Sequence, residues 1–427
     1  MINTNDIFLK KLLSLNTTQK FREINILNPV TARMILSSNP SQLSGLLKNI
    51  ELISKLAGKP YKNPDSSANG PIVLAVSENR HVIGLYPDEC HCLIVGQTGS
   101  GKSTLLKIIF SQALVFNRLN PQFEAMENII CWLFCKAQDM RNLLKINKNV
   151  LIVTFKMIKL NPLEPPSNLS TTEWSSIFAD LWTQAFRLYD GSKGLLIDCL
   201  NYLYNKYSST DFYPSLFDLY YYVRALKFPL ISRSSRYQES ILNRLGGLIH
   251  SPLGSVFDCS RGHISNLINL HTIFEITFLT AEQQVFMVNY LLSYLFYHKL
   301  IRETGLRHFV GIDDANLIFD ISFEKRPDLG LPIIHHLLTT VRKSKINIFA
   351  CTQTPHQIGA SIHSNSFAKV MFSLSHGKDI DCMQQSMGIK DPMQRDYCYK
   401  LMPREAVFKF SARHQEPFLA KVQEVNL

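Results

Sequence analysis

The chain has 427 residues, a length that suits two or three domains of about 100–200 residues each, or one large core with an insertion. Hydrophobic residues make up 46% of it and charged residues 19%, which excludes intrinsic disorder as its main state. The net charge of +11 favours a polyanionic partner, nucleic acid before an anionic membrane surface; a basic surface without such a partner is the alternative.

Residues 1–70 are predicted to form a small, basic, helical N-terminal region. Apolar side chains recur at helical spacing between Leu43 and Ile53. Residues 59–70 are rich in Pro, Ser, Asn and Gly, which indicates a linker and places the first domain boundary at residue 70. The N-terminus has no signal-peptide pattern, and no run reaches the roughly 18 apolar residues that a membrane helix needs. We therefore expect a soluble, cytoplasmic protein without a transmembrane segment.

Residues 71–427 are predicted to form one α/β domain with a largely parallel sheet. Short apolar runs rich in β-branched residues alternate with helical periodicity, a pattern typical of strands buried on both faces. Residues 168–262 are instead aromatic and helix-periodic throughout, and predict a helical insertion in this core. The predicted strands are Ile72–Val76, His81–Leu85, Cys92–Val95, Ile129–Phe134, Val150–Phe155, Thr272–Phe278, Phe309–Ile312, Ile346–Cys351 and Lys369–Ser373, and a helix is predicted over Ser103–Phe116.

The nine cysteines lie mostly in apolar stretches, which indicates buried free thiols in a reducing compartment. Cys90 and Cys92 flank His91, a grouping that resembles part of a metal site. No second Cys/His pair stands at zinc-ligand spacing, so this spacing predicts no zinc site.

A phosphate-binding signal follows the predicted strand Cys92–Val95. The pattern G-x-x-x-x-G-K-[ST] is matched without deviation, with a strand before it and an apolar helix after it. Glycines let backbone N–H groups turn toward phosphate oxygens, and the helix N-terminus adds positive potential. Lys102 is expected to neutralise the β- and γ-phosphates, and Ser103 to offer its hydroxyl to Mg²⁺. The expected nucleotide-binding residues are Gly96, Gln97, Thr98, Gly99, Ser100, Gly101, Lys102, Ser103 and Thr104.

Two carboxylates end another predicted strand. Asp313 directly follows Phe309–Ile312, which places it at the carboxyl end of a buried strand, where it is expected to hold Mg²⁺. Asp314 comes next and is the candidate base that orients the attacking water. An Asp-Asp turn that merely ends a core strand is the alternative.

A third strand, Ile346–Cys351, leads to Thr352 and Gln353. The Gln353 amide both donates and accepts, so it can sense the γ-phosphate or hold water; capping a loop is the alternative. Arg342 precedes Gln353 by eleven residues on a predicted helix. It is either a solvated charge or an arginine finger that reaches the nucleotide of a neighbouring subunit.

These stretches together resemble the HerA/FtsK superfamily of ring-forming DNA-pumping ATPases, which includes type IV secretion and conjugative coupling ATPases. The resemblance extends from about residue 71 to the C-terminus. Its most particular features are the strand before Asp313 and an arginine ten residues before Thr-Gln-x-Pro. The stretches that carry it are residues 81–106, 160–166, 309–320, 339–355, 364–375, 401–410 and 416–422.

The resemblance implies a RecA-like P-loop core that binds ATP and Mg²⁺, with ATP hydrolysed at the subunit interfaces of a homo-hexamer that moves DNA through its central channel. It implies Lys102 and Ser103 for nucleotide and Mg²⁺, Asp313 for Mg²⁺, Gln353 as sensor and Arg342 as the finger acting in trans. The family usually has Glu at the position of Asp314. The shorter side chain predicts slow hydrolysis unless the backbone compensates. Residues 1–70 do not match the β-barrel that precedes the motor in archaeal-type HerA.

Basic residues in the predicted insertion are candidates for sequence-independent contact with DNA phosphates, with tyrosines nearby for stacking. The alternative is a solvated helical face above a tyrosine-rich core. The candidate residues are Arg224, Lys227, Arg233 and Arg236.

Three variants of the function stay open at this point. The protein is a coupling or packaging ATPase that hands DNA to a secretion or conjugation channel, or a motor that works with a nuclease in repair or defence. The third is of another class: an ATP-controlled switch or scaffold with weak hydrolysis that binds protein partners through residues 1–70 and moves no DNA.

Overall fold

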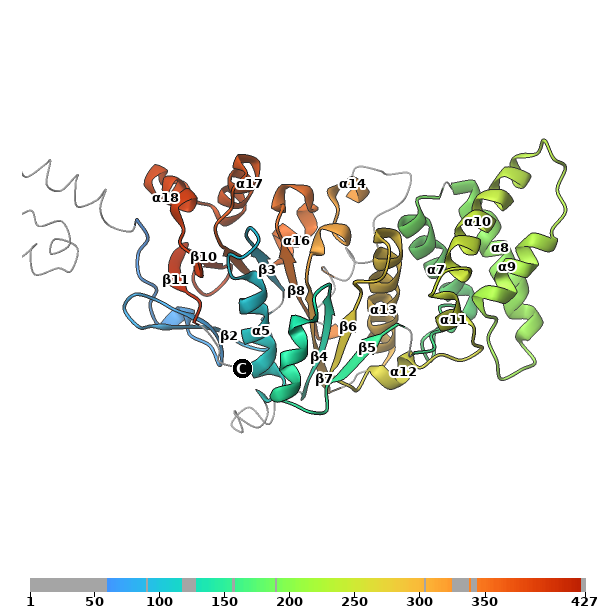
Figure 1. Cartoon of the computed structure of the whole chain (residues 1–427), viewed down its shortest axis with the longest axis horizontal. Coiled ribbons are helices and arrows are strands. Elements are labelled where there is room, and N and C mark those ends of the chain that lie inside the picture. The colour runs from blue at the N-terminus through green and yellow to red at the C-terminus, as the bar shows by residue number, and fades with distance from the viewer. Residues whose placement is uncertain are drawn as a thin grey trace, which may run out of the picture. The chain divides into compact units, whose positions relative to one another are not determined.

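The computed structural model describes residues 60–423, except 90, 117–127, 156–157, 189, 303–304, 325–337 and 339–343. The chain divides into two units: residues 1–62 with 389–400, and residues 63–388 with 401–427. The helical pattern predicted before residue 54 lies outside the described residues. The larger unit contains the whole sheet (Figure 1).

An eleven-stranded sheet forms the centre of the larger unit, in the order β2-β1-β11-β10-β9-β3-β8-β7-β4-β6-β5. The seven strands from β9 to β5 are parallel, and the other pairs are antiparallel. The α/β prediction with a largely parallel sheet is thus confirmed. The strands are Ile72–Val76 (β1), Val82–Leu85 (β2), Cys92–Val95 (β3), Asn128–Cys135 (β4), Leu151–Thr154 (β5), Thr272–Glu275 (β6), Leu306–Ile312 (β7), Ile346–Thr352 (β8), Ala368–Met371 (β9), Glu405–Phe410 (β10) and Phe418–Lys421 (β11).

All nine predicted strands are present, with ends within three residues of the predicted ones. Strands β10 and β11 were not among the predicted strands. These two strands pair antiparallel with each other, and β10 also pairs with β9, so they join the parallel strands to β1 and β2. Which strands become neighbours depends on contacts between distant segments, and local periodicity does not report such contacts.

Strand β4 explains why the parallel strands are apolar along their whole length. Cys131 and Leu133 belong to the core cluster that includes the apolar side chains of helix α5 (Lys102–Ala113). Trp132 and Phe134 contact Phe274 of β6, with ring centroids 5.3 and 4.8 Å apart. Successive side chains of a strand point to opposite faces, so both faces of β4 are buried.

Gly311 of β7 allows α5 to pack closely on the sheet. A Cβ at this position would lie 2.9 Å from Cζ of Phe110 and 3.2 Å from Cγ of Leu133, both fully buried side chains. We expect Gly311→Ala to lower the free energy of unfolding by about 1–3 kcal/mol, because the core has no room for the methyl group. Urea denaturation measures this change.

Gly247→Ala is the matched control. Gly247 is exposed in the last turn of helix α10 (Arg233–Ile249), and a Cβ there would have no atom within 4 Å. Alanine restricts the unfolded chain and suits a helix, so this variant is expected to gain about 0.4–1 kcal/mol. Unchanged or increased stability of Gly311→Ala would contradict the packing argument.

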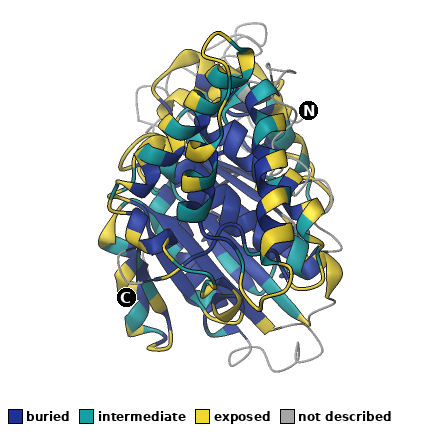
Figure 2. Ribbon diagram, turned by 90° about the vertical axis from the view of Figure 1, so that its right-hand side faces the viewer, coloured by how far each residue is buried: buried dark blue, intermediate teal, exposed yellow. Residues whose placement is uncertain are grey.

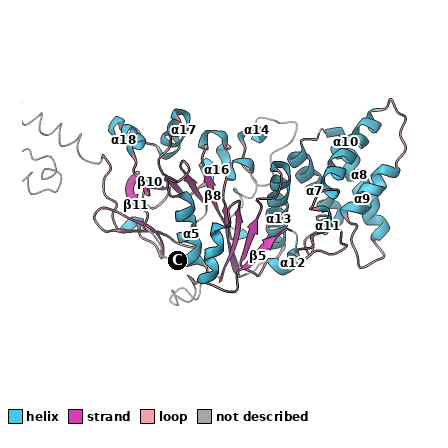
Figure 3. Ribbon diagram, in the orientation of Figure 1, coloured by secondary structure: helices cyan, strands magenta, loops and turns pink. Residues whose placement is uncertain are grey.

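Between β5 and β6 the described chain forms helices only, which lie together beside the sheet (Figure 3). Two of them begin with capping boxes, Ser170 with Glu173 and Ser215 with Asp218, in which each side chain accepts from the other residue's backbone N–H. The helices are Thr171–Phe186 (α7), Asp190–Tyr207 (α8), Leu216–Ala225 (α9), Arg233–Ile249 (α10), Gly254–Phe257 (α11) and Ile264–Leu267 (α12).

Helix α13 (Ala281–Ile301) is the apolar stretch of the sequence, and it is a core helix. Phe286 contacts the rings of Phe178 and Trp182 on α7, and most residues of α13 are buried. In Figure 2 the sheet and the inward faces of the helices are buried, whereas the outer turns are exposed. Within the described part of the chain, no helix has the length and apolar character required to cross a membrane.

Short helices connect the remaining strands of the larger unit. They are Ser66–Ala68 (η1), Gln138–Lys145 (η3), Ala315–Leu317 (η4), Ile321–Glu324 (α14), Pro355–Gln357 (η6), Ala360–Asn365 (α16) and Gly377–Met387 (α17).

The described part of the smaller unit comprises residues 60–62 and 389–400, with helices Pro392–Tyr397 (α18) and Cys398–Lys400 (η7). Tyr61 joins its two segments: its hydroxyl donates to the carbonyl of Gln394 at 3.0 Å, and its ring meets Tyr397 edge-to-face. Burial raises the pKa of Tyr61 far above its ordinary value, so this phenol stays neutral.

Candidate nucleotide-binding site

A tight turn between β3 and α5 carries residues 96–101. Gly99 and Gly101 have backbone φ angles of +78° and +123°, which side chains with a Cβ rarely tolerate, so the turn requires glycine at both positions. Gly101 is also the N-cap of α5 and offers no side chain to the first N–H groups of the helix. These donors, together with the helix dipole, favour an anion at this point.

The interior of the turn is shaped for close approach of a ligand. A Cβ on Gly96 would collide with the Ser100 hydroxyl and lie 2.7 Å from Cβ of Phe372. The Ser100 hydroxyl is buried and has no hydrogen-bond partner among the described residues. A buried polar atom without a partner marks a place where a ligand or water completes the bonding. Space and donors therefore fit a phosphate group, as the sequence pattern predicts.

Lys102 projects from the first turn of α5 back onto the turn that precedes it. Its Nζ donates to the carbonyl oxygens of Gly96 at 2.6 Å and Gln97 at 2.9 Å. Burial lowers the pKa of Lys102, and the nearby Cys351, Asp313 and Asp314 act in the opposite direction. The two carbonyls hold the ammonium group at the loop, where phosphate oxygens can replace them as acceptors. Ser103 and Thr104 follow, half-buried, on the same helical turn.

The carboxyl ends of three neighbouring parallel strands meet at this turn. β3 lies beside β8, with Val95 opposite Thr352, and β8 lies beside β7. Gly96 N–H donates to the Thr352 carbonyl at 3.2 Å. Thr98 Oγ1 donates to Gln353 Oε1 at 3.1 Å, so the predicted sensor is bonded to the phosphate-binding turn itself.

Asp313 lies directly after β7, and its backbone N–H donates to the carbonyl of Phe134 at 2.9 Å. Burial raises the pKa of Asp313 above its ordinary value, and the negative charges of Asp139 and Asp314 raise it further. Lys102 and Lys136 oppose this shift. Asp313 and Lys102 thus each shift the pKa of the other, as expected if both groups face one triphosphate and one Mg²⁺.

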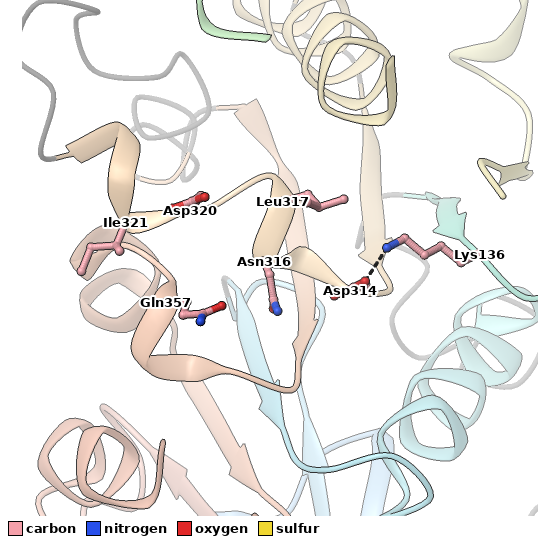
Figure 4. A pocket seen from close by; sticks show the side chains of 7 residues that line it. All are labelled: Lys136, Asp314, Asn316, Leu317, Asp320, Ile321 and Gln357. Carbon is pink, nitrogen blue, oxygen red and sulfur yellow. Dashed lines mark hydrogen bonds and ion pairs between the residues drawn. The ribbon is translucent and has the colours of Figure 1, made fainter. Parts of the chain in front are cut away.

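Asp314 is in a different setting from Asp313. Its backbone is left-handed, with φ of 66°, and its carboxylate forms an ion pair with Nζ of Lys136. The pair lies at one side of a pocket of about 510 Å³, with Gln357 and Ile321 at the opposite side (Figure 4). The candidate base is thus already paired with a cation.

Lys136 is a site residue that the sequence patterns did not predict. It is the first residue after β4, the other neighbour of β7, so its position follows from the strand order. The available signal was a lysine at the end of a predicted strand, but only the pairing of β4 with β7 brings it to Asp314.

Two backbone contacts from the C-terminal half of the chain support the turn, and they too were not predicted. Gln97 N–H donates to the carbonyl of Ser373 at 2.8 Å, just after β9. Arg404 N–H donates to the carbonyl of Ser100 at 3.0 Å, just before β10. The turn is therefore held from the β9 side as well as from the β8 side.

Two predicted groups remain to be placed. Arg342 lies outside the described residues. Four exposed cations lie at the end of α9, at the start of α10 and in the segment between them, and none forms an ion pair within the described chain: Arg224, Lys227, Arg233 and Arg236.

The tyrosines of the insertion divide between core and surface. Tyr204 is buried and donates to the carbonyl of Leu163 at 2.6 Å. Tyr202 and Tyr221 are more than half exposed, and the ring of Tyr202 stacks on Tyr222 with centroids 4.5 Å apart. Tyr204 thus belongs to the core, whereas stacking on DNA stays a prediction for the exposed Tyr202 and Tyr221.

No family model and no curated protein matches this sequence. Solved structures do match. VirB4 of Thermoanaerobacter pseudethanolicus has a TM-score of 0.64 and 12% identity, over 86% of this chain and 98% of that one. The unbound bacterial conjugative coupling protein TrwB has a TM-score of 0.58 and 12% identity, over 87% and 97%. TrwB in complex with ADP and Mg²⁺ has a TM-score of 0.55 and 12% identity, over 80% and 86%.

At 12% sequence identity, these matches show a shared fold. The RecA-like core, the phosphate-binding turn at the end of β3 and the likeness to VirB4 and TrwB agree with one another. The chain has the fold of the HerA/FtsK-type P-loop ATPases, as its motifs predict.

Proposed function

We propose that this protein is an ATPase that couples ATP hydrolysis to the movement of DNA. The observation that carries the proposal is the convergence of the glycine turn, Gln353 and Asp313 at the ends of the adjacent strands β3, β8 and β7. Open α/β sheets bind ligands at the carboxyl ends of their strands. The coupling protein TrwB, which shares the fold, has been solved with ADP and Mg²⁺, and this supports the same ligands here.

The residues have separate tasks in this proposal. The backbone of residues 96–101 and the ammonium group of Lys102 bind the phosphates. Ser103 and Asp313 would hold Mg²⁺, which neutralises charge on the β- and γ-phosphates when bound. Gln353 is bonded to Thr98, and this bond supports a role in which Gln353 senses the γ-phosphate and passes the change to the loop that follows β8. Asp314 orients water only if it is released from Lys136.

We further propose a homo-hexameric ring in which Arg342 acts on the nucleotide of the adjacent subunit. The exposed cations of α9 and α10 would contact DNA phosphates, and the exposed Tyr221 would add stacking. Contacts of this kind read no sequence, as a motor that travels along DNA requires. The fold shared with the conjugative protein TrwB favours a secretion or conjugation partner.

DNA binding with a steep salt dependence is the expected result. Four phosphate contacts predict a loss of affinity of about 10²-fold when salt rises from about 50 to 200 mM. Replacing the four cations Arg224, Lys227, Arg233 and Arg236 by alanine should reduce the slope of log Kd against log salt by about four. Fluorescence anisotropy with duplex DNA measures both. Lys148→Ala, which removes an exposed cation between η3 and β5, should leave the slope unchanged.

Steady-state ATP turnover completes the test, because a motor is stimulated by DNA. Stimulation of the wild-type protein, lost together with DNA binding in the four-cation variant, supports the proposal. DNA binding that does not depend on salt, or an ATP turnover rate that DNA does not change, refutes the proposed motor function.

A second candidate function is an ATP-controlled switch, and the ion pair between Asp314 and Lys136 favours it. A base held by a cation, on a side chain shorter than glutamate, orients water poorly. A switch binds ATP but turns it over at a negligible rate with or without DNA, so the same turnover measurement separates the two functions.

A further inference from the structure

Three side chains converge beside the candidate nucleotide site and take no part in it. His356 lies in η6, His376 is the N-cap of α17, and Asp379 lies in the first turn of α17. Nδ1 of His356 is 2.6 Å from Oδ1 of Asp379, and Nδ1 of His376 is 3.8 Å from Oδ2 of the same carboxylate. Each carboxylate oxygen therefore faces one imidazole nitrogen, and the three ligand atoms lie within 4.8 Å of one another.

The carboxylate in this cluster is buried and lacks a permanent cation. The Asp379 side chain is 4% exposed. Among the described residues no lysine or arginine forms an ion pair with it, and its partners are the two imidazoles and the backbone N–H of His356. Burying an ionised carboxylate is costly unless a positive charge compensates it. An imidazole supplies that charge only when it is protonated, whereas a bound metal ion supplies it in every case.

The position of Asp379 in α17 explains only part of the arrangement. An acidic residue in the first turn of a helix is favoured by the helix dipole. That effect does not require two imidazoles, one of them from a different segment, on the two oxygens of the same carboxylate. Their rings lie nearly parallel, with centroids 5.6 Å apart and an interplanar angle of 27°. A shared ligand explains why both rings present Nδ1 to one point.

We propose that His356, His376 and Asp379 bind a divalent transition-metal ion of the zinc class. Two imidazole nitrogens with one carboxylate oxygen suit Zn²⁺, Co²⁺ or Ni²⁺, whereas Mg²⁺ prefers an all-oxygen shell. Ligands about 2.0–2.1 Å from the ion are about 3.3 Å apart in a tetrahedron, and small side-chain rotations bring the present distances to that value. Three protein ligands leave the fourth position to water or to another ligand.

An ion bound by these residues would lie close to the predicted γ-phosphate sensor, Gln353. The three residues line a pocket of about 490 Å³ together with Gln97 and Gln353. His356 follows Gln353 by three residues, and Gln353 is bonded to Thr98. An ion that ties His356 to α17 would restrict the loop that carries the sensor. Metal binding by these three side chains requires no ATP hydrolysis.

The test uses the full-length protein with any affinity tag removed, free of nucleotide, and titrates it with Co²⁺. Tetrahedral Co²⁺ with nitrogen ligands has visible d–d absorption, which reports the site directly. The expected result is one Co²⁺ per chain, displaced by Zn²⁺ and unaffected by excess Mg²⁺. His376→Ala and His356→Ala should each weaken Co²⁺ binding by at least about tenfold, the lower limit for loss of even an outer-shell partner.

His376 is the decisive position, because its side chain is 59% exposed and its loss spares the fold. His363→Ala is the matched control: this half-buried histidine of α16 donates from Nε2 to the Pro355 carbonyl and lies outside the cluster, so Co²⁺ binding should persist. No Co²⁺ absorption in the wild-type protein, or wild-type Co²⁺ affinity in both His356→Ala and His376→Ala, overturns the proposal and leaves a simple imidazole–carboxylate pair. A Co²⁺ signal that Mg²⁺ abolishes also overturns it, since it would place the ion at Asp313.

Discussion

Lys102→Ala is expected to lower ATP turnover by about 10²–10³-fold, the range found when a single group that stabilises transition-state charge is removed. Lys102 is the buried cation of the glycine turn, and its Nζ is held by two carbonyl oxygens at the position that phosphates would take. Alanine leaves the turn intact, because its shape depends on Gly99 and Gly101. Nucleotide affinity should fall as well, and turnover and titration with a fluorescent ATP analogue measure the two effects.

Lys107→Ala is the control for this variant. Lys107 lies on the same helix, one and a half turns further on, and forms a partly exposed ion pair with Asp139 at 2.7 Å. Removing it subtracts the same charge from α5 while the turn is untouched, so turnover should change little. Wild-type turnover in Lys102→Ala would show that the glycine turn is not the hydrolytic site.

Asp313→Asn is expected to have two opposite effects: ATP turnover falls by about 10²-fold or more, and the protein becomes more stable at neutral pH. Turnover falls because asparagine cannot supply the negative charge that a Mg²⁺ ligand needs. Stability rises because the buried Asp313 carboxylate, beside Asp139 and Asp314, has a raised pKa and is therefore ionised at a cost. Thermal unfolding without nucleotide and steady-state turnover measure the two effects on the same sample.

The sign of the pH dependence follows from the same shift. The folded state holds the Asp313 proton more tightly than the unfolded chain does. Its favourable contribution to stability is therefore complete below the ordinary aspartate pKa and is lost as pH rises through the raised value. The stability difference between Asp313→Asn and the wild type should appear above that range and vanish below it. Turnover of the wild type should be lost as pH falls through the same range.

Asp139→Asn tests whether Asp313 is the group whose protonation causes the loss of turnover at low pH. Asp139 is the neighbouring charge that, after burial, most raises the pKa of Asp313. Neutralising Asp139 should shift the loss of turnover at low pH to a lower pH and preserve the rate at neutral pH. If turnover of Asp139→Asn is lost at the same pH as that of the wild type, Asp313 is not the group that titrates.

The adjacent carboxylates Asp313 and Asp314 thus have different surroundings and different expected roles. The first is buried among negative charges and suits a cation. The second is paired with Lys136 in a left-handed turn, at the edge of a pocket. If the protein is a motor, as proposed, ATP or DNA binding is expected to separate that ion pair; if it is a switch, the pair is expected to persist.

Part of this protein was predictable because the information is local. The glycine turn, Lys102 and the helix after it form one continuous segment, and its conformation follows from glycine freedom and from the strand and helix patterns on either side. Asp313 and Gln353 were predictable for a related reason: each directly follows a buried strand, and parallel strands bring their carboxyl ends to one edge.

The tertiary structure alone decided which side chains meet across the sheet. Lys136 reaches Asp314 across 178 positions because β4 pairs with β7, and Arg404 supports Ser100 because β10 returns beside β9. His356 joins Asp379 because η6 packs on α17, although their spacing resembles no metal motif. The physical reason is the same in each case: local sequence determines the conformation of a segment, whereas the neighbours of that segment depend on how the whole apolar core is buried.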